Sequence, residues 1–299
     1  MKLNPVAAAL ACLIVLGTEC PDQLTLPSDD FGSYWYQGQA EITSYRLQQA
    51  RYGEMREGRA VLVFVTEDFS RAKHVKLDDF ENAGADRQTV LKLNLTKKFT
   101  TGIYPYSLMT SVFMPVESGA GPAAVKVTTS AQEWCGHTFL QLNLRDGRYI
   151  GSGFSYFESE GDREFSLPVT YLEDEIWTRI RLNPESLPTG DFQMIPGTLF
   201  QRLRHVDESP ETVSADRSSD GGTATYRLAY PSLERTLTIK FDETFPHGIL
   251  EWSETEWSGH GDNRREMTTT AVRDTTIMSD YWNRNRLEDE SLRAVLGLE

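Results

Sequence analysis

The sequence is poor in histidine and lacks the short motifs of common enzyme sites. Only five histidines occur in the chain. His247, His260 and Asp262 lie near one another, but without the tight spacing of a metal-ligand motif. There is also no Gly-x-Ser-x-Gly elbow, no phosphate-binding glycine-rich loop and no zinc helix. We therefore expect no cofactor and no metal, and we favour a protein that is not an enzyme.

Basic residues are scarce relative to acidic ones. The chain has 30 Lys and Arg against 44 Asp and Glu, a net charge of -14. Such a chain is repelled by phosphate backbones, and it has no basic stripe interleaved with aromatic residues. Nucleic acid is therefore not an expected partner. After residue 20 no apolar run approaches the roughly 20 residues of a membrane helix, so we expect contact with a membrane only through an N-terminal anchor.

The first residues have the pattern of a secretory signal. Lys2 precedes an eleven-residue apolar run at positions 6–16, and small or polar residues follow it. We interpret residues 1–19 as a signal peptide and expect a location in the bacterial cell envelope. Cys20 stands where a lipoprotein signal places its acylated cysteine, although Gly17 and Glu19 fit that signal poorly. The alternative is ordinary cleavage near Gly17, which releases a periplasmic protein.

The rest of the chain reads as a short tether, residues 20–32, and a single β-rich domain, residues 33–299. Runs of alternating or β-branched residues recur with turn residues between them, and Asp146-Gly147 is a typical hairpin turn. This pattern predicts a mainly β fold, a large antiparallel curved sheet or half-open barrel. The strand candidates are 40–49, 59–66, 89–101, 104–116, 123–134, 137–144, 148–157, 164–167, 197–205, 223–230, 235–241, 248–257 and 266–277.

Three segments depart from the strand pattern. Apolar residues at helical spacing, with acidic residues in the first turn, predict one short inserted helix over 172–182. Ser279 and the residues up to Leu296 predict a C-terminal helix, or two, that docks on the sheet or closes its open side. The polar residues 207–222 predict a loop.

The densest cluster of polar and aromatic residues lies around position 135. Glu133, Trp134, Cys135 and His137 are candidate ligand-binding residues, with Glu133 as an acid or base and Cys135 with His137 as a nucleophile pair. The alternative is a structural strand in which Gly136 permits a bulge and Cys135 is a small buried thiol.

Aromatic residues are abundant along the predicted strands. Trp252 and Trp257 are the candidates that we single out from this set for a ligand cavity. Large curved sheets can enclose such a cavity, whereas an ordinary aromatic core is the structural alternative.

Several stretches resemble an uncharacterised group of Bacteroidetes-type envelope lipoproteins. These stretches are residues 33–54, the 132–137 cluster and the closing segments 281–283 and 292–298. Members of that group are sometimes labelled septum formation inhibitors of the Maf type, but this chain has no Ser-Pro-Arg-Arg-like motif near its N-terminus and no α/β alternation. The resemblance implies a lipid anchor at Cys20 and brings no activity with it.

Three functions are compatible with these observations. The first is an exported protein that binds or carries an apolar, lipid-like ligand. The second is a structural or interaction lipoprotein that recruits another envelope component. The third is a hydrolase with a site near Glu133, Cys135 and His137. A continuous apolar cavity favours the first, and a filled core with an exposed apolar patch favours the second.

Overall fold

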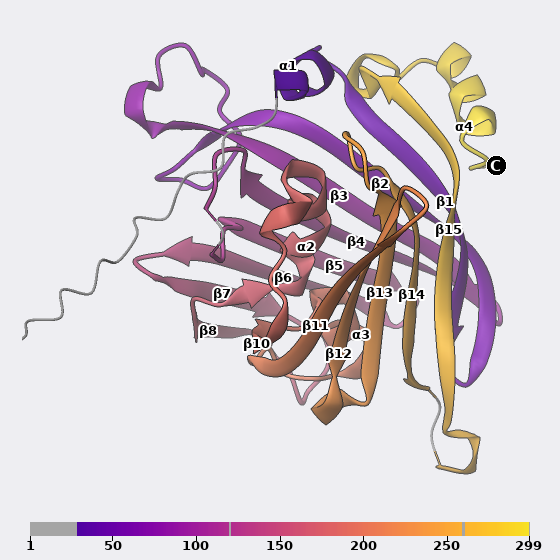
Figure 1. Ribbon diagram of the computed structural model, residues 1–299. Coiled ribbons are helices and arrows are strands. Elements are labelled where there is room, and N and C mark those ends of the chain that lie inside the picture. The colour runs from indigo at the N-terminus through magenta and orange to yellow at the C-terminus, as the bar shows by residue number, and fades with distance from the viewer. Residues whose placement is uncertain (1–28, 120, 259–260, 299) are drawn as a thin grey trace, which may run out of the picture.

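The structure is a computed structural model that describes residues 29–119, 121–258 and 261–298 (Figure 1). Within these residues the α-helices are α1 (Asp29–Trp35), α2 (Glu173–Leu182), α3 (Thr198–Arg204) and α4 (Ser291–Val295). The strands are β1 (Ala40–Arg51), β2 (Glu54–Ser70), β3 (Arg87–Thr101), β4 (Tyr104–Pro115), β5 (Lys126–Glu133), β6 (Gly136–Arg145), β7 (Arg148–Phe154), β8 (Arg163–Pro168), β9 (Tyr171–Leu172), β10 (Gly190–Ile195), β11 (Glu211–Asp220), β12 (Thr223–Tyr230), β13 (Arg235–Asp242), β14 (Ile249–Ser258) and β15 (Arg265–Ser279).

All the strands belong to one curved sheet. Its order is β8-β7-β6-β5-β4-β3-β2-β1-β15-β14-β13-β12-β11-β10-β9. Strands that are consecutive in the chain pair antiparallel, except that β9 and β10 are parallel and that β8 and β9 do not pair. The pairing of β1 with β15 joins the two halves of the chain. The sheet does not close, because β8 and β9 remain its two edges. The predicted fold class, a large curved and mainly antiparallel sheet, is confirmed.

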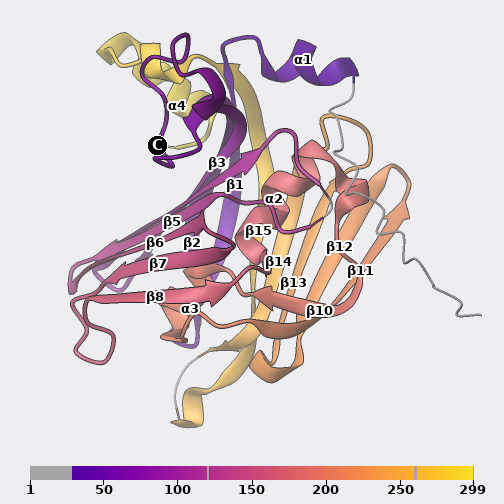
Figure 2. The same cartoon turned by 90° about the vertical axis from the view of Figure 1, so that its left-hand side faces the viewer.

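The concave face of the sheet carries the main core. Along β4, for example, Tyr106 and Leu108 are buried whereas Pro105 and Ser107 are exposed, the period-two pattern of a sheet with one buried face. Helices α2 and α3 lie inside the curve, and both pack on β4 (Figure 2). The C-terminal segment instead docks on the outside, where Leu296 packs with Ala40 and Ile42.

Helix α2 confirms the predicted inserted helix, but its charged side chains are buried rather than solvated. Glu173, Glu175, Arg179 and Arg181 are all nearly inaccessible to water. Isolated buried charges are very costly, so each needs a partner of opposite charge. The partners come from α2 itself and from the sheet.

Four buried ion pairs lie in and around α2, and two of them join the helix to the sheet. Arg181 donates to both carboxylate oxygens of Glu41 on β1, at 2.6 and 2.5 Å. Arg235 on β13 donates to Glu173 at 2.7 Å and to Glu254 on β14 at 2.7 Å. Within the helix, Arg179 donates to Glu175 at 2.8 Å.

The secondary structure predicted for two segments was wrong. The segment 197–205 is helix α3, not a strand, because contacts from distant residues satisfy both of its ends. Asp174 accepts the first backbone N–H, from Thr198, at 3.0 Å, and Arg51 donates to the carbonyl of Leu203 at 2.6 Å. The segment 207–222 is mostly strand β11, whose polar residues face solvent while Val213 and Ala215 face the core.

The structure also bears on the ends of the chain. The predicted signal peptide and Cys20 lie outside the described residues. Residues 29–32 of the predicted tether form the start of α1, whose Phe31 and Trp35 are buried in the core. The predicted C-terminal helix is present only as α4 with two short 3₁₀ turns before it, Tyr281–Asn283 and Leu287–Glu290. No helix among the described residues is long and apolar enough to cross a membrane.

Breaking a buried ion pair should unfold this protein far more readily than breaking a surface pair. Arg235→Met leaves Glu173 as a buried carboxylate without its cation and leaves Glu254 with Lys97 at 4.0 Å, so we expect the free energy of unfolding to fall by about 3–5 kcal/mol. The matched control is Arg227→Met, whose 3.6 Å pair with Asp216 is 46% and 62% exposed and should contribute less than about 1 kcal/mol. Urea denaturation of both variants measures this, and equal losses would contradict the role given to the buried pairs.

Candidate functional site

A narrow cleft lies on the concave face, between α3 and the strands β5 to β8. It is at the end of the sheet that carries the turns after β1, β3, β5 and β7, which we call the lower end. The cleft is lined by Thr129, Thr138, Phe139, Leu140, Gly153, Phe154, Ser155, Glu160, Gly161, Arg163, Thr198, Gln201, Arg202, His205, Val206, Asp207 and Glu208. We call it the α3 cleft.

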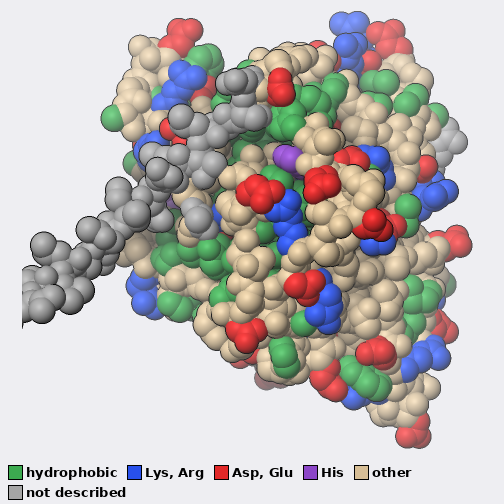
Figure 3. Space-filling view, in the orientation of Figure 1, with side chains coloured by type: hydrophobic (Ala, Val, Ile, Leu, Met, Phe, Trp, Pro, Cys, Tyr) green, Lys and Arg blue, Asp and Glu red, His purple; other side chains and the backbone are tan. Residues whose placement is uncertain are grey.

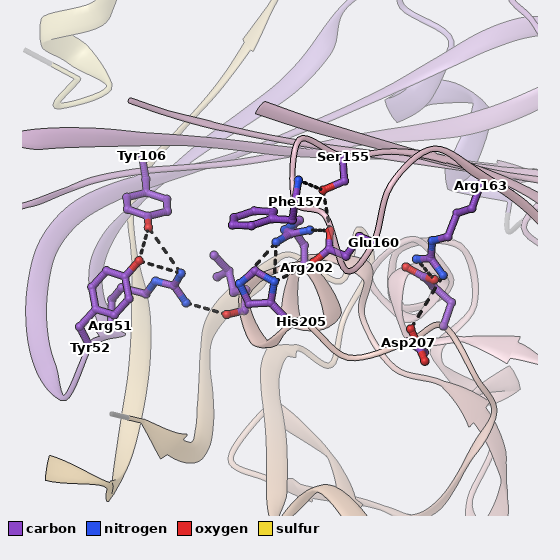
Figure 4. Close-up of polar contacts among 12 residues, drawn as sticks. Arg51, Tyr52, Tyr106, Ser155, Phe157, Glu160, Arg163, Arg202, His205 and Asp207 are labelled. Atoms are coloured by element: carbon purple, nitrogen blue, oxygen red, sulfur yellow. Dashed lines mark hydrogen bonds and ion pairs between the residues drawn. The ribbon is translucent and has the colours of Figure 1, made fainter. Parts of the chain in front are cut away.

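One wall of the α3 cleft is an ion-pair cluster that joins α3 to the connection between β7 and β8 (Figure 4). Glu160 forms an ion pair with Arg202 and accepts from His205 Nδ1 at 2.7 Å and from Ser155 at 2.7 Å. The Arg202 guanidinium also lies 4.8 Å from the centre of the Phe157 ring. Burial raises the pKa of Glu160, but the hydrogen bonds from Arg202, Ser155 and His205 outweigh it and hold the pKa below its usual value.

The other wall is built at the edge of the sheet. Arg163 on β8 forms an ion pair with Glu208, in the segment that follows α3, and its guanidinium covers the Phe165 ring at 4.8 Å. Gly153 on the neighbouring strand lies beside this side chain, so that a Cβ there would be in van der Waals contact with Arg163, at 3.4 Å. The two ion-pair clusters therefore tie α3 and the segment after it to the sheet.

The floor of the α3 cleft is polar. The hydroxyls of Thr110, Thr129 and Thr198 form a chain, at 2.9 Å between the first two and 2.5 Å between the last two. Gln201 is only 1% exposed, yet neither its amide nitrogen nor its amide oxygen has a partner among the described residues. A buried amide without partners costs about 1–3 kcal/mol, so Gln201 is a group that a ligand can satisfy.

A third cluster lies at the C-terminal end of α3 (Figure 4). Arg51 donates to Leu203 O, and its guanidinium lies 4.4 Å from the Tyr52 ring. The Tyr52 and Tyr106 hydroxyls are 2.9 Å apart. Burial and the hydrogen bond with Tyr52 raise the pKa of Tyr106. At Tyr52 burial also raises the pKa, but the hydrogen bond with Tyr106 and the positive charge of Arg51 outweigh burial and lower the pKa. This cluster positions α3 against the β1–β2 turn.

The sequence-predicted residues near position 135 lie on the surface, in the turn between β5 and β6. Trp134 and Cys135 form this turn, so Cys135 and His137 do not project from one strand face as predicted. Both are exposed, which also makes the buried-thiol alternative wrong. Cys135 contacts Glu133, and the hydrogen bond with this carboxylate raises the pKa of the thiol. None of the four residues lines the α3 cleft, although Trp134 packs on Tyr104 with 6.3 Å between ring centres.

The two predicted tryptophans on β14 do not share a site. Trp252 is buried, packs on Trp177 of α2, and lines a second small pocket beside α2 and α3. Trp257 lies five residues further along the strand, so it projects from the opposite face, where Arg264 covers its ring at 4.3 Å. Sequence analysis missed Gln201, Arg202 and His205, because it took their segment for a strand.

Among residues 29–119, 121–258 and 261–298, no group of three or more His, Cys, Asp or Glu side chains is placed to hold a metal ion. Figure 3 shows basic and acidic side chains interspersed on one face of the molecule, without a broad patch of either sign. The α3 cleft likewise combines arginine with carboxylates and hydroxyls. The arrangement suits hydrogen bonding to a polar group.

Comparison with known proteins gives little further information. No protein-family model matches the chain, and no curated protein matches it. Among solved structures, the chain is similar to a β-barrel-like protein of Domain of Unknown Function DUF1849 from Brucella abortus. The sequence identity is 8% and the TM-score 0.44, over 81% of this chain and 98% of that one. The resemblance to Bacteroidetes-type lipoproteins therefore stays a prediction.

Asp174, which anchors the start of α3, should make stability depend on pH. Burial raises its pKa to about 7, and the nearby Glu173 charge adds to this. Between about pH 4 and pH 7 the folded carboxyl therefore holds a proton that the unfolded one has lost, so the free energy of unfolding falls as the pH rises.

Asp174→Asn should remove this contribution, and the variant should lose less stability than the wild type between about pH 4 and pH 7. Some slope should persist, because burial also raises the pKa of Glu256 to about 7. Urea denaturation across this pH range measures the effect, with Asp191→Asn on the surface as control. Identical slopes in Asp174→Asn and the wild type would contradict the assignment.

Proposed function

We propose that this protein is an exported envelope protein that binds an amphiphilic, lipid-like ligand, with the ligand's polar group in the α3 cleft. The observation that carries the proposal is Gln201. Its buried amide has an unused donor and an unused acceptor among the described residues, and it lies on a cleft floor made of hydroxyls. Buried polar groups are almost always hydrogen-bonded in folded proteins, so a site that leaves one free is suited to a ligand.

The size of the α3 cleft limits what enters it. The volume of the cleft is about 50 Å³. One bound water molecule needs roughly 10–15 Å³ of cavity volume, so the cleft has room for only a few such molecules. A polar head of a few atoms fits, but a hydrocarbon chain does not. The interior above it is filled by α2, so the apolar part of the ligand has to remain at the mouth.

The mouth offers apolar surface for that part of the ligand. Four consecutive connections at the lower end, after β1, β3, β5 and β7, each expose a large apolar or aromatic side chain. We call this set the apolar rim: Tyr52 at 46% exposure, Ile103 at 81%, Trp134 at 68% and Tyr156 at 46%. Tyr104 and Tyr106 continue the rim toward the cleft, with 5.8 Å between their ring centres. Contiguous exposed apolar side chains of this kind typically mark binding surfaces.

The charges of the α3 cleft favour a neutral or zwitterionic polar group. Arg202 and Arg163 are already paired with Glu160 and Glu208. A free anion would meet these carboxylates, whereas hydroxyl or amide groups can both donate to and accept from Gln201 and the threonine hydroxyls.

The apolar rim also favours one alternative function, the recruitment of another envelope component, because exposed tryptophan and tyrosine are typical of protein interfaces. The hydrolase is not proposed. Its nucleophile Cys135 lies in an exposed turn, and Glu133 raises the pKa of its thiol, which disfavours the reactive thiolate.

Gln201→Met should weaken ligand binding and stabilise the protein at the same time. The substitution keeps a similar shape and removes a buried amide without partners, so we expect the free energy of unfolding to rise by about 1–3 kcal/mol. Binding of a neutral fluorescent amphiphile, the primary amide of dansyl-aminoundecanoic acid, should weaken by about tenfold. Fluorescence titration and urea denaturation provide the two readouts.

The control for this variant is Gln193→Met, because Gln193 is an exposed glutamine that donates to Thr212. It should leave amphiphile binding unchanged. If Gln201→Met bound the probe as tightly as the wild type, the α3 cleft would not be the site of the polar group.

The proposed export has its own test. If residues 1–19 are a signal peptide and Cys20 an anchor, the protein released from its native envelope should begin at Cys20 and carry acyl chains. Intact-mass spectrometry reads both features, and Cys20→Ser should convert the protein to a form without acyl mass. An unprocessed chain that retains Met1 would refute export, and a bare chain beginning near Thr18 would refute the anchor alone.

A further inference from the structure

A second opening lies at the end of the half-open barrel where β1 begins and β13 and β15 end. We call this the upper end, opposite the α3 cleft. The opening is lined by Tyr34, Glu41, Thr43, Asp242, Pro246, Gly248, Ile249, Arg273, Asp274 and Thr276, and we call it the upper groove. Its volume is about 400 Å³, against about 50 Å³ for the α3 cleft. Binding sites for small molecules usually measure roughly 300–1,000 Å³, so the upper groove has room for a whole small ligand.

The base of the upper groove is a fixed polar network. Tyr34 on α1 donates to Glu41 at 2.5 Å, and Arg181 holds the same carboxylate from below. Thr43 and Thr276 face each other across β1 and β15 with 2.9 Å between their hydroxyl oxygens. All of these side chains except the exposed Thr276 are buried or half-buried, and each is held by a hydrogen bond. Their positions are therefore set before any ligand arrives, which lowers the entropic cost of binding.

One side of the groove carries an ion pair that remains accessible. Arg273 donates to Asp242 at 3.2 Å, and the two side chains are 37% and 40% exposed. The Asp274 carboxylate instead accepts from Arg59 at 2.7 Å on the outer face of the sheet, beside Gly297 of the C-terminal segment. Gly248 leaves space for the first pair, since a Cβ there would lie 3.0 Å from the Asp242 carboxylate and 3.1 Å from the Arg273 guanidinium.

Irregularities in both flanking strand pairs shape this site. The register of β1 against β15 shifts between Ser44 and Tyr45, and the register of β13 against β14 shifts between Lys240 and Phe241. Such bulges re-aim side chains and are frequent next to functional sites. The first shift lies beside Arg273, Asp274 and Thr276, which line the groove.

We infer that the upper groove binds a neutral polyhydroxylated ligand, a sugar or a sugar-bearing molecule. Each carboxylate is already neutralised by an arginine but keeps free lone pairs, and Arg273 keeps free N–H donors. A free anion would meet Asp242, and a cation would have to displace Arg273. Adjacent hydroxyls on one ligand donate to the carboxylates and accept from the guanidinium without adding charge.

The test is a binding titration of the full chain, followed by saturation-transfer NMR and calorimetry. The probes are maltose and N-acetylglucosamine as neutral saccharides, inorganic phosphate as anion and putrescine as cation. The wild type should bind at least one saccharide, and Arg273→Gln and Asp242→Asn should each weaken that binding by about tenfold or more. The matched control is Arg264→Gln, which breaks a surface pair with Glu234 of 2.8 Å at the other end of the sheet and should leave saccharide binding unchanged.

Gln201→Met separates this inference from the proposed amphiphile site, because it should leave saccharide binding intact. The altered side chains are partly exposed, so the variants should fold, and circular dichroism with a thermal melt verifies this. Binding of phosphate or putrescine alone would overturn the inference, as would binding of no probe. Saccharide binding that persists unchanged in both Arg273→Gln and Asp242→Asn would overturn it too.

Discussion

The architecture depends on the pairing of buried charges between helix α2 and the sheet that curves around it. Arg181 with Glu41 ties α2 to β1, and Glu173 with Arg235 and Glu254 ties it to β13 and β14. Each of these charges would be prohibitively costly alone in the interior. Their geometry therefore fixes where α2 lies, and the sheet can keep its half-open curve because the helix fills it (Figure 2).

This filling decides where ligands can bind. A barrel with an empty apolar interior can hold a lipid chain, but here charged side chains and α2 occupy that space. Binding surfaces are displaced to the two ends of the curve. The lower end is narrow, has the unsatisfied Gln201 on its floor, and is bordered by the apolar rim. The upper end is wider and is bordered by hydroxyls and an exposed ion pair. The two ends thus differ in both size and chemistry.

Much of the fold could be predicted from the sequence, because strands, turns and α2 leave local signals. Alternation along β4 and the Asp146-Gly147 turn are examples: both residues of this turn have positive φ, 49° and 71°, as a tight hairpin requires. Gly221-Gly222 is an equally clear turn signal, with φ of 57° and 85°, and it could have revealed β11 and β12 as a hairpin.

The candidate sites could not be predicted in the same way. Helix α3 is completed by Asp174 and Arg51, which are distant in sequence, and its own residues also fit a strand. The partners of the α2 charges are likewise distant, so the acidic first turn predicted where the helix begins but not that its charges are buried. The sequence drew attention to Cys135 for its chemical type, yet its position in an exposed turn depends on the pairing of β5 with β6.

We expect ligands to bind at the two ends of the curved sheet and not inside it. Amide chemical-shift mapping of the isotope-labelled protein, titrated with the primary amide of dansyl-aminoundecanoic acid, tests this most directly. Perturbations should concentrate on Ser155, Glu160 and Gln201 and extend to the apolar rim. Perturbations centred on Trp177 and Ile180, in the filled interior beside α2, would contradict the account.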